Sequence, residues 1–513
     1  MAPAADRTFT DLTALGIRSV IILFVVTLGA TLAALGPLIS PIIPPVAVVA
    51  IIISIVSVLQ PRYGVLLLIF LISFVEEFRG GISTDMFERS ERTFFYARTL
   101  GIPTLYAPDV IIGGLLAVFL IREIFLRRGL PLHVDRISVA LALICLAVAL
   151  SLFFSYIGPE PFGPSILDLS LVGSIELPEE VARLIAILQY KLFLLFVPTY
   201  LLGLFYFNSE QDIKNLLRVV SVAMIGTIAL ASLRLIRDPS LVTQLVAIIY
   251  DTASVWLMAL TVFYNVGMWG AGKYTSSQTI VRGIFCLLLI LFILLSFRRT
   301  LWGAIALATL FYPLILAPKS YAKVLALSSI AAIVALMVLG GTSIGQALLS
   351  SVLARLGETN FNEASTLYRF ALLVWFVERS ADLPLFGYGL KPLWNEQIRL
   401  RFFVTHMENV HSLYFWILLR LGPVGFFMSM ISLGLILSQI RRLFHMLTQD
   451  YLRLLVGVIF LGIIMILFSG IFNPVYGRTR FIVPMAFLLA MLSRLPYILD
   501  ENQRVASSGD RCA

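Results

Sequence analysis

Charged residues are scarce in this chain. They make up 13% of its 513 residues, whereas soluble domains carry about 25%. Hydrophobic residues reach 59%, and apolar runs of about twenty residues, each long enough to cross a ~30 Å hydrocarbon layer, recur along nearly the whole length. The composition therefore excludes an ordinary soluble protein and predicts an all-α polytopic membrane protein.

Cysteines and repeats are scarce as well. Of the three cysteines, Cys145 and Cys286 lie inside apolar segments and Cys512 lies in the C-terminal tail. These positions exclude a disulfide framework and show no metal-ligand spacing. No internal repeat is evident between the two halves of the chain, although many secondary transporters contain one.

The apolar runs predict about fourteen membrane helices. We place them near residues 17–38, 43–59, 62–77, 107–126, 136–157, 184–207, 214–236, 245–270, 279–297, 300–317, 321–340, 410–440, 452–472 and 480–496. The chain then divides into an N-terminal bundle of about eleven helices, a large loop, C-terminal helices and a tail. Their bounds are 1–340, 341–409, 410–496 and 497–513.

Basic residues predict the orientation of these helices, because lysine and arginine mark cytoplasmic loops. Those in the short loops fall on alternate connections: Arg62, Arg122, Arg127, Arg128, Arg136, Lys214, Arg218, Lys273, Arg282, Lys319, Lys323, Arg441, Arg442 and Arg453. The net charge of +9 is thus expected to set orientation and not to bind nucleic acid. Both termini are then cytoplasmic, and the long loops face outward.

The large outer loop contains its own secondary-structure signals. Residues 365–378 carry apolar side chains at helical spacing, and Ser365 or Thr366 can cap the start. Residues 382–389 follow with turn-forming proline and glycine. We expect an amphipathic helix on the outer surface of the bundle.

Several arginines lie on the expected outer side, against the orientation rule. They are Arg234, Arg237, Arg298, Arg299, Arg369, Arg478 and Arg480. One interpretation is that each anchors a helix end at the membrane surface. The other is an external anion site, since guanidinium groups bind phosphate oxygens bidentately and keep their proton. We favour the anion site because a histidine is expected on the same side.

That histidine, His411, stands where the long loop re-enters an apolar segment. A lone histidine there is often only a helix cap. A neutral imidazole also accepts a proton from an attacking hydroxyl group, and positioned bases accelerate reactions about 10²–10⁴-fold. His406 and Glu408 lie near enough in sequence to assist. The outer loops hold only scattered acids such as Asp382 and Glu396, so we predict neither a metal ion nor a cofactor.

Three motifs resemble the O-antigen ligase and polymerase superfamily (the Wzy_C, WaaL-like membrane glycosyltransferases). In the first, His411 opens a helix, followed by Phe415, Gly422 and Gly425, while Ser412 and Arg420 stand where Asn and Glu are common. The second comprises Arg369, Trp375, Pro384, Gly387 and Gly389. The third is Arg299 at the outer end of a helix pair, within 296–303.

The resemblance implies a metal-independent fold like that of the lipid-sugar (GT-C) glycosyltransferases in a bacterial inner membrane, with its active face periplasmic. The donor would be an undecaprenyl-diphosphate-linked glycan. The acceptor would be another lipid-linked glycan for a polymerase, lipid A core for a ligase, or a protein. Arg299 and Arg369, with Arg298 beside them, would bind the diphosphate, and His411 would activate the acceptor. We favour a polymerase over a ligase and expect a chain-length regulator as a further partner.

Two other classes stay open. A transporter or lipid flippase would need paired broken helices and an ion-coupling acid, for which Lys191 and Asp251 inside apolar segments are the candidates. The same two residues can instead pair within the bundle and serve packing alone. A non-catalytic scaffold has no use for external arginines beside a histidine.

Overall fold

The computed structural model describes a helical protein with one short hairpin. The described residues are 60–75, 107–126, 134–157, 191–237, 252–296, 298–315, 383–387, 397–400, 403–406, 412–472 and 479–509, with 249, 322, 346, 350, 373–374, 376–377 and 389. The helices of the first half are α3 (Pro61–Phe74), α4 (Ala107–Leu126), α5 (Arg136–Ile157), α7 (Lys191–Tyr206), α8 (Glu210–Arg237) and α10 (Thr252–Gly270). The later elements are α11 (Ser276–Leu294), α12 (Arg299–Phe311), the 3₁₀ turn η4 (Tyr312–Leu314), β1 (Gln397–Leu400), β2 (Phe403–His406), α16 (Leu413–Met446), α17 (Asp450–Phe472) and α18 (Thr479–Gly509).

The helices fall close to the predicted spans. α4 and α5 have the bounds expected from the sequence, and the other described helices start or end within several residues of them. The spans predicted near 17–38, 43–59 and 321–340 lie outside the described residues, apart from residue 322. At the C-terminal end, α18 continues through residues 497–509, which we expected to form a tail.

Six helices among the described residues are long and apolar enough to cross a membrane. They lie within α5, α8, α11, α16, α17 and α18, and α3, α4 and α7 contribute shorter apolar stretches. Their exposed faces carry large apolar side chains such as Leu233, Ile236 and Val281. Such faces suit lipid and not water, so the chain is a helical membrane protein.

The chain forms two compact units, and neither is continuous in sequence. The first unit comprises residues 1–135, 194–223 and 479–513. In its core, α18 packs against α3. Tyr200 Oη of α7 lies 3.0 Å from Ser493 Oγ of α18, and the Ser493 hydroxyl in turn bonds to Asp135.

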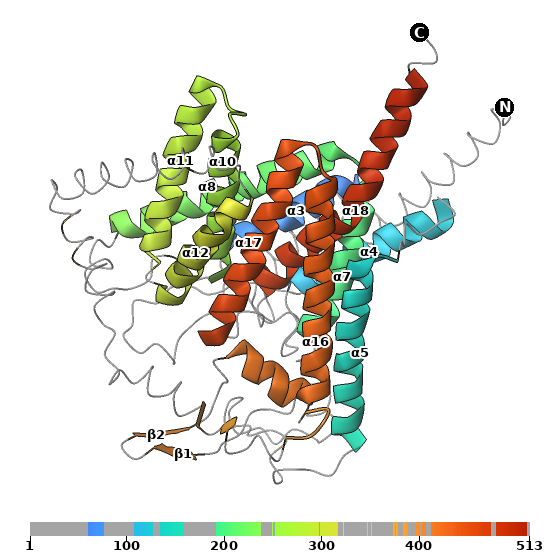
Figure 1. Ribbon diagram of the computed structural model, residues 1–513, viewed down its shortest axis with the longest axis vertical. Helices are drawn as coiled ribbons and strands as arrows, with labels where there is room; N and C mark the ends of the chain where they lie inside the picture. Colours follow the sequence, from blue (N-terminus) through green and yellow to red (C-terminus); the bar gives the residue numbers. More distant parts are fainter. Residues whose placement is uncertain are drawn as a thin grey trace, which may run out of the picture. The chain divides into compact units, whose positions relative to one another are not determined.

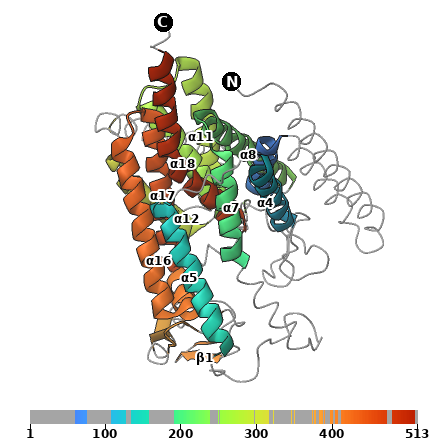
Figure 2. The same ribbon diagram turned by 90° about the vertical axis from the view of Figure 1, so that its right-hand side faces the viewer.

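The second unit comprises residues 136–193 and 224–478. Its α5 and α16 run side by side (Figure 2). α17 packs against α10, α12 and α16, and the buried indole of Trp256 on α10 donates to the Gly462 carbonyl of α17 at 3.1 Å. α17 is therefore the central helix of this unit (Figure 1).

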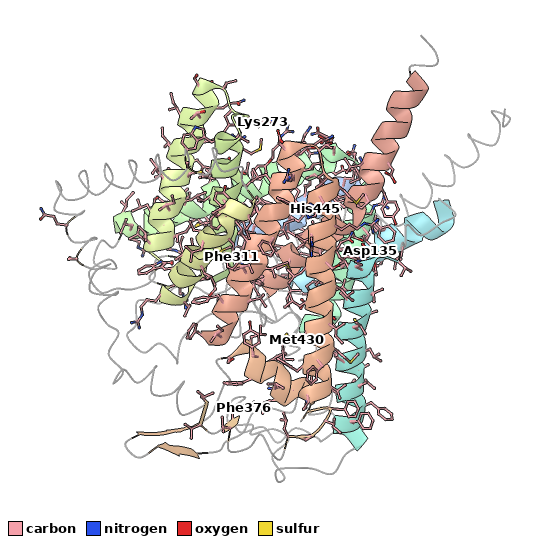
Figure 3. The ribbon with its side chains drawn as sticks, in the orientation of Figure 1. Asp135, Lys273, Phe311, Phe376, Met430 and His445 are labelled. Carbon is pink, nitrogen blue, oxygen red and sulfur yellow. The ribbon has the colours of Figure 1, made fainter. Side chains whose placement is uncertain are left out.

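The two ends of the second unit differ in charge. At one end, Lys273 pairs with Asp450 at 2.8 Å, between the α10–α11 turn and the start of α17. Exposed Arg441 and Arg442 lie in the last two turns of α16, towards the same end. Figure 3 labels Lys273 and His445 at this end and Phe376 at the other. Three of the basic residues that we expected in cytoplasmic loops, Lys273, Arg441 and Arg442, thus lie towards one end of this unit.

One element was not predicted. β1 and β2 form an antiparallel hairpin in which Leu400 pairs with Phe403 and Gln397 with His406. The sequence alternates apolar and polar residues over Gln397–Leu400, a pattern typical of a strand. We had predicted no strand in this part of the large loop, whereas the helical class expected for the rest of the chain holds for the other described elements.

Candidate functional site

The structure places only some of the predicted site residues. Arg369, Glu408, His411 and Arg478 lie outside the described residues. His406 is the last residue of β2, and its side chain is outside the description. Their sequence neighbours are described, however, and these show where the segments that carry them lie.

Arg298 and Arg299 form the start of α12. Arg298 is the N-cap residue, and its carbonyl accepts hydrogen bonds from Leu301 and Trp302. The Ser296 hydroxyl donates to the Ile293 carbonyl at 2.6 Å, so the turn between α11 and α12 is tight. Both arginine side chains are half-buried. A helix N-terminus carries partial positive charge and backbone N–H donors, so this corner combines three features that attract an anion.

The segment after His411 forms the first part of α16. α16 begins at Leu413, two residues beyond the histidine, and Ser412 is the N-cap residue with extended backbone. The Tyr414 hydroxyl donates to the Leu467 carbonyl of α17 at 2.8 Å. A Cβ added to Gly470 would lie 2.9 Å from Leu413 Cδ2. The start of α16 therefore rests on the end of α17.

α12 reaches the same end of α17. A Cβ added to Gly303, four residues after Arg299, would lie 3.0 Å from Phe468 Cε1. Phe468 stands between Leu467 and Gly470, the contacts of the α16 start. The segments that carry Arg299 and His411 thus converge on residues 467–470 of α17.

The segment after Arg369 joins them. Phe376 stacks on Phe415 of α16 with ring centroids 4.3 Å apart, and Figure 3 shows Phe376 below the first part of α16. Residues 373–374 and 376–377 are helical, as predicted for this stretch of the loop. Neighbours of all three motif residues therefore contact one end of the second unit.

α16 is broken at Gly422, which has φ 70° and precedes Pro423. Figure 1 shows the short first part of α16 turned away from the long second part. Pro423 lacks an N–H, and the positive φ of Gly422 lies in a region that favours glycine. The sequence signal, Gly-Pro inside an apolar run, was present, but we predicted one continuous helix over 410–440.

A turn of the large loop docks into this break. Gly387 donates to the Pro384 carbonyl at 2.9 Å, which closes the turn, and Gly387 also has positive φ. A Cβ added to Gly387 would lie 2.5 Å from the carbonyl carbon of Arg420. The Pro-x-x-Gly-x-Gly and Gly-x-x-Gly motifs therefore meet through their backbones. We call this contact the junction: Leu385, Gly387 and Gly389 against Arg420, Gly422 and Val424.

Arg420 lies buried behind the junction. Arg420 is only 6% exposed. One of its guanidinium nitrogens donates to the Gly389 carbonyl at 3.3 Å. Its guanidinium carbon lies 6.0 Å from the Trp416 ring centroid, within reach of a cation–π interaction. We had noted Arg420 only as a departure from the motif, and the structure gives it a role in holding the loop turn.

Of the accessory arginines, the structure describes Arg234, Arg237 and Arg480. Arg480 is fully buried in the first unit, and its guanidinium donates to the carbonyls of Ile72 at 2.7 Å and Ser73 at 2.6 Å, where α3 ends. Arg234 and Arg237 lie in the last turn of α8, where the negative end of the helix dipole stabilises a positive charge. Arg234 is half-buried and Arg237 is exposed.

The opposite end of the second unit holds a polar cluster at the α10–α11 turn. Tyr274 donates to Asn265 Oδ1 at 3.0 Å, and Arg282 donates to the same oxygen at 2.7 Å. Burial raises the pKa of Tyr274 to about 12, although Arg282 opposes this rise. The phenol stays neutral at ordinary pH and serves as a donor that closes the turn.

Among the described residues, no group of three or more His, Cys, Asp or Glu side chains is arranged to hold a metal ion. His406, Glu408 and His411 are outside this comparison because their side chains are not described. The expectation of a metal-free site therefore stays a prediction.

These features define a class: a multi-pass helical membrane protein with an arginine-bearing helix start and a broken helix at one end. Residues 284–430 match the family model Wzy_C, described as O-antigen ligase. This segment is thus similar to the O-antigen ligase family, in agreement with the resemblance that the motifs predicted. No curated protein and no solved structure matched the chain significantly.

Proposed function

We propose that this protein is a membrane glycosyltransferase that moves a glycan from an undecaprenyl-diphosphate donor to an acceptor sugar at the periplasmic face. It would act as a polysaccharide polymerase or as an O-antigen ligase, and we favour the polymerase. The observation that carries the proposal is the convergence of the α12 and α16 starts on residues 467–470 of α17. This convergence supports a shared site for Arg299 and His411.

The proposed chemistry divides the reaction between these residues. His411 accepts the proton of the acceptor hydroxyl as its oxygen attacks the anomeric carbon of the donor sugar. The bond from that carbon to the diphosphate oxygen breaks, and undecaprenyl diphosphate leaves. Arg299, Arg369 and Arg298 hold the diphosphate and stabilise the charge that develops on it. This division needs no metal ion and no cofactor.

The distribution of charge supports an orientation for the site. Lys273, Arg441 and Arg442 gather at the end of the second unit opposite Phe376, and basic residues mark the cytoplasmic side. The end with Arg299 would then face the periplasm. About fourteen spans with both termini cytoplasmic would agree with this orientation.

The broken helix gives little support to the transporter alternative. Unwound carbonyls in transporters coordinate an ion, but here the Arg420 carbonyl accepts from the Ser151 hydroxyl at 2.6 Å and from the Gly389 N–H at 3.2 Å. The break is thus occupied by the chain itself. Asp251, the candidate coupling acid, lies outside the described residues.

A glycan profile tests the proposal in cells. A deletion strain should lose polymer or ligated glycan, and His411→Ala should fail to restore it while expressing and inserting normally. Arg369→Lys should also fail, because lysine cannot form the bidentate fork. Full glycan from the His411→Ala strain would refute the catalytic role, and altered substrate uptake with normal glycan would favour a transporter.

A further inference from the structure

At the break in α16, two hydrogen bonds to the loop turn replace the helical hydrogen bond between Val424 and Arg420. In an unbroken helix, the Val424 N–H would donate to the Arg420 carbonyl four residues earlier. Here Val424 donates to the Leu385 carbonyl at 3.2 Å, and the Arg420 carbonyl accepts from Gly389 at 3.2 Å. The Val424 N–H and the Arg420 carbonyl are thus both satisfied by the loop turn, as buried backbone groups require.

Ser151 of α5 adds the third bond at this place. Its fully buried hydroxyl donates to the Arg420 carbonyl at 2.6 Å, a shorter contact than the one from Gly389. Phe154, one turn further along α5, stacks on Phe386 with centroids 4.1 Å apart and planes 9° apart. α5 therefore holds both partners of the junction, the break in α16 and the loop turn.

The junction sets the direction of a short helix. The first part of α16, Leu413–Leu421, is held at both ends. Near its end, the Arg420 carbonyl accepts from Ser151 of α5, and near its start, the Tyr414 hydroxyl donates to a carbonyl of α17. The buried cluster of Ala147, Val148 and Leu421 fills the space beside the break. The Arg420 carbonyl therefore lies at the far end of the helical segment that begins two residues after His411, and three bonds meet there.

We propose that Ser151 is a positioning residue for glycan transfer: its hydroxyl holds the junction, and the junction aims the helix that starts just after His411. Ser151 lies outside residues 284–430, the segment that matches the family model. The inference rests on the proposed function, because it assigns His411 as the group being positioned. A displacement of about 1 Å in a reacting group is enough to cost roughly 100-fold in rate.

A matched control exists on the same pair of helices. Ser432 of α16 is also fully buried, and its hydroxyl lies 2.8 Å from two acceptors, the Ala140 carbonyl of α5 and the Met428 carbonyl of its own helix. Ser151→Ala and Ser432→Ala thus remove the same group and the same kind of bond between α5 and α16. Only the first removal touches the break.

The test compares these two variants in full-length protein reconstituted in vesicles with a synthetic undecaprenyl-diphosphate glycan. We expect Ser151→Ala to lower kcat by about tenfold to 100-fold with the donor KM within about twofold. Ser432→Ala should leave both within about twofold. Combined with His411→Ala, Ser151→Ala should cause no further loss. Equal kcat values for the two serine variants would overturn the proposal.

Hydrogen exchange of the same variants separates the two claims. In Ser151→Ala, the amide exchange rates of the peptides that contain Gly387 and Val424 should both rise. In Ser432→Ala, these rates should stay at the wild-type values. Wild-type exchange in Ser151→Ala would overturn the junction's dependence on Ser151, whatever the transfer rate. Wild-type transfer by His411→Ala would instead overturn the proposed function, even where exchange has changed.

Discussion

Single arginines in this protein serve different purposes, and their partners distinguish them. Arg480 donates to two backbone carbonyls in a fully buried place, whereas Arg299 stands half-buried at a helix start. Arg420 ties the loop turn to α16. Among the outer arginines that the structure describes, Arg298 and Arg299 lie at a helix start, which also attracts negative charge.

Arg480 is expected to stabilise the first unit and not to bind substrate. Arg480→Leu leaves the Ile72 and Ser73 carbonyls buried without their charged donor, so it should lower the free energy of unfolding by about 2–4 kcal/mol. Thermal unfolding in detergent measures this, with Arg237→Leu on an exposed side chain as the control. Unchanged stability together with weaker donor binding would assign Arg480 to the substrate instead.

Arg299 is expected to act through its fork geometry. Arg299→Lys keeps the charge but loses bidentate bonding, so kcat/KM for the lipid-linked donor should fall at least about tenfold. Arg441→Lys, at the opposite end of the second unit, is the matched control and should change little. A similar kcat/KM for both variants would argue that Arg299 only anchors the start of α12.

At the scale of elements, the broken helix and the loop turn explain why two glycine motifs occur together. Gly387 and Gly422 both have positive φ, and each occupies the space where a Cβ of the other would lie. The motifs are thus one backbone contact between distant parts of the chain. Their glycines are needed for the close approach of the two backbones.

Gly422→Ala is expected to disrupt this contact. The added Cβ would meet the Leu385 carbonyl and the Gly387 N–H, and the positive φ is unfavourable for alanine, so the loss of stability should exceed about 2 kcal/mol. Gly434→Ala on the same helix meets nothing within 4 Å and should be neutral or stabilising by up to ~1 kcal/mol. Thermal unfolding of both variants measures this difference. Equal stability of the two variants would contradict a close backbone contact at the junction.

The sequence predicted elements well where hydrophobicity decides them. The predicted bounds of α4 and α5 agree with the structure, because turns with charged residues or proline mark the ends of their apolar runs. The contact between Gly387 and Gly422 was not predicted, because it depends on backbone conformation between residues far apart in sequence. Ser151 was missed for a similar reason: one small polar residue in an apolar helix leaves no periodic signal, and its partner is a carbonyl 269 residues away.

At the scale of the whole molecule, the ion pair of the α10–α11 turn and the contacts of the motif segments lie at opposite ends of the second unit. The Lys273–Asp450 pair and the Tyr274 cluster lie at one end, and the contacts around residues 467–470 lie at the other. The family match over residues 284–430 spans α12, the loop turn and the start of α16. The matched segment thus includes the contacts at the end of the second unit opposite Lys273.

Labelling from the two sides of the membrane tests this polarity. In a background with the three native cysteines replaced by serine, Lys273→Cys should react with an impermeant maleimide only from the cytoplasmic side. Leu385→Cys, at a position 64% exposed in the loop turn, should react only from the periplasmic side. Reaction of both from one side would contradict the proposed orientation.

The most direct test of the account is glycan transfer by the purified, reconstituted protein with an undecaprenyl-diphosphate glycan as donor. The wild type should extend or transfer the glycan and release undecaprenyl diphosphate in equal amount, in the presence of a chelator. His411→Ala should still bind the donor but react about 10²–10⁴-fold more slowly. Transfer at the wild-type rate by His411→Ala would contradict the account.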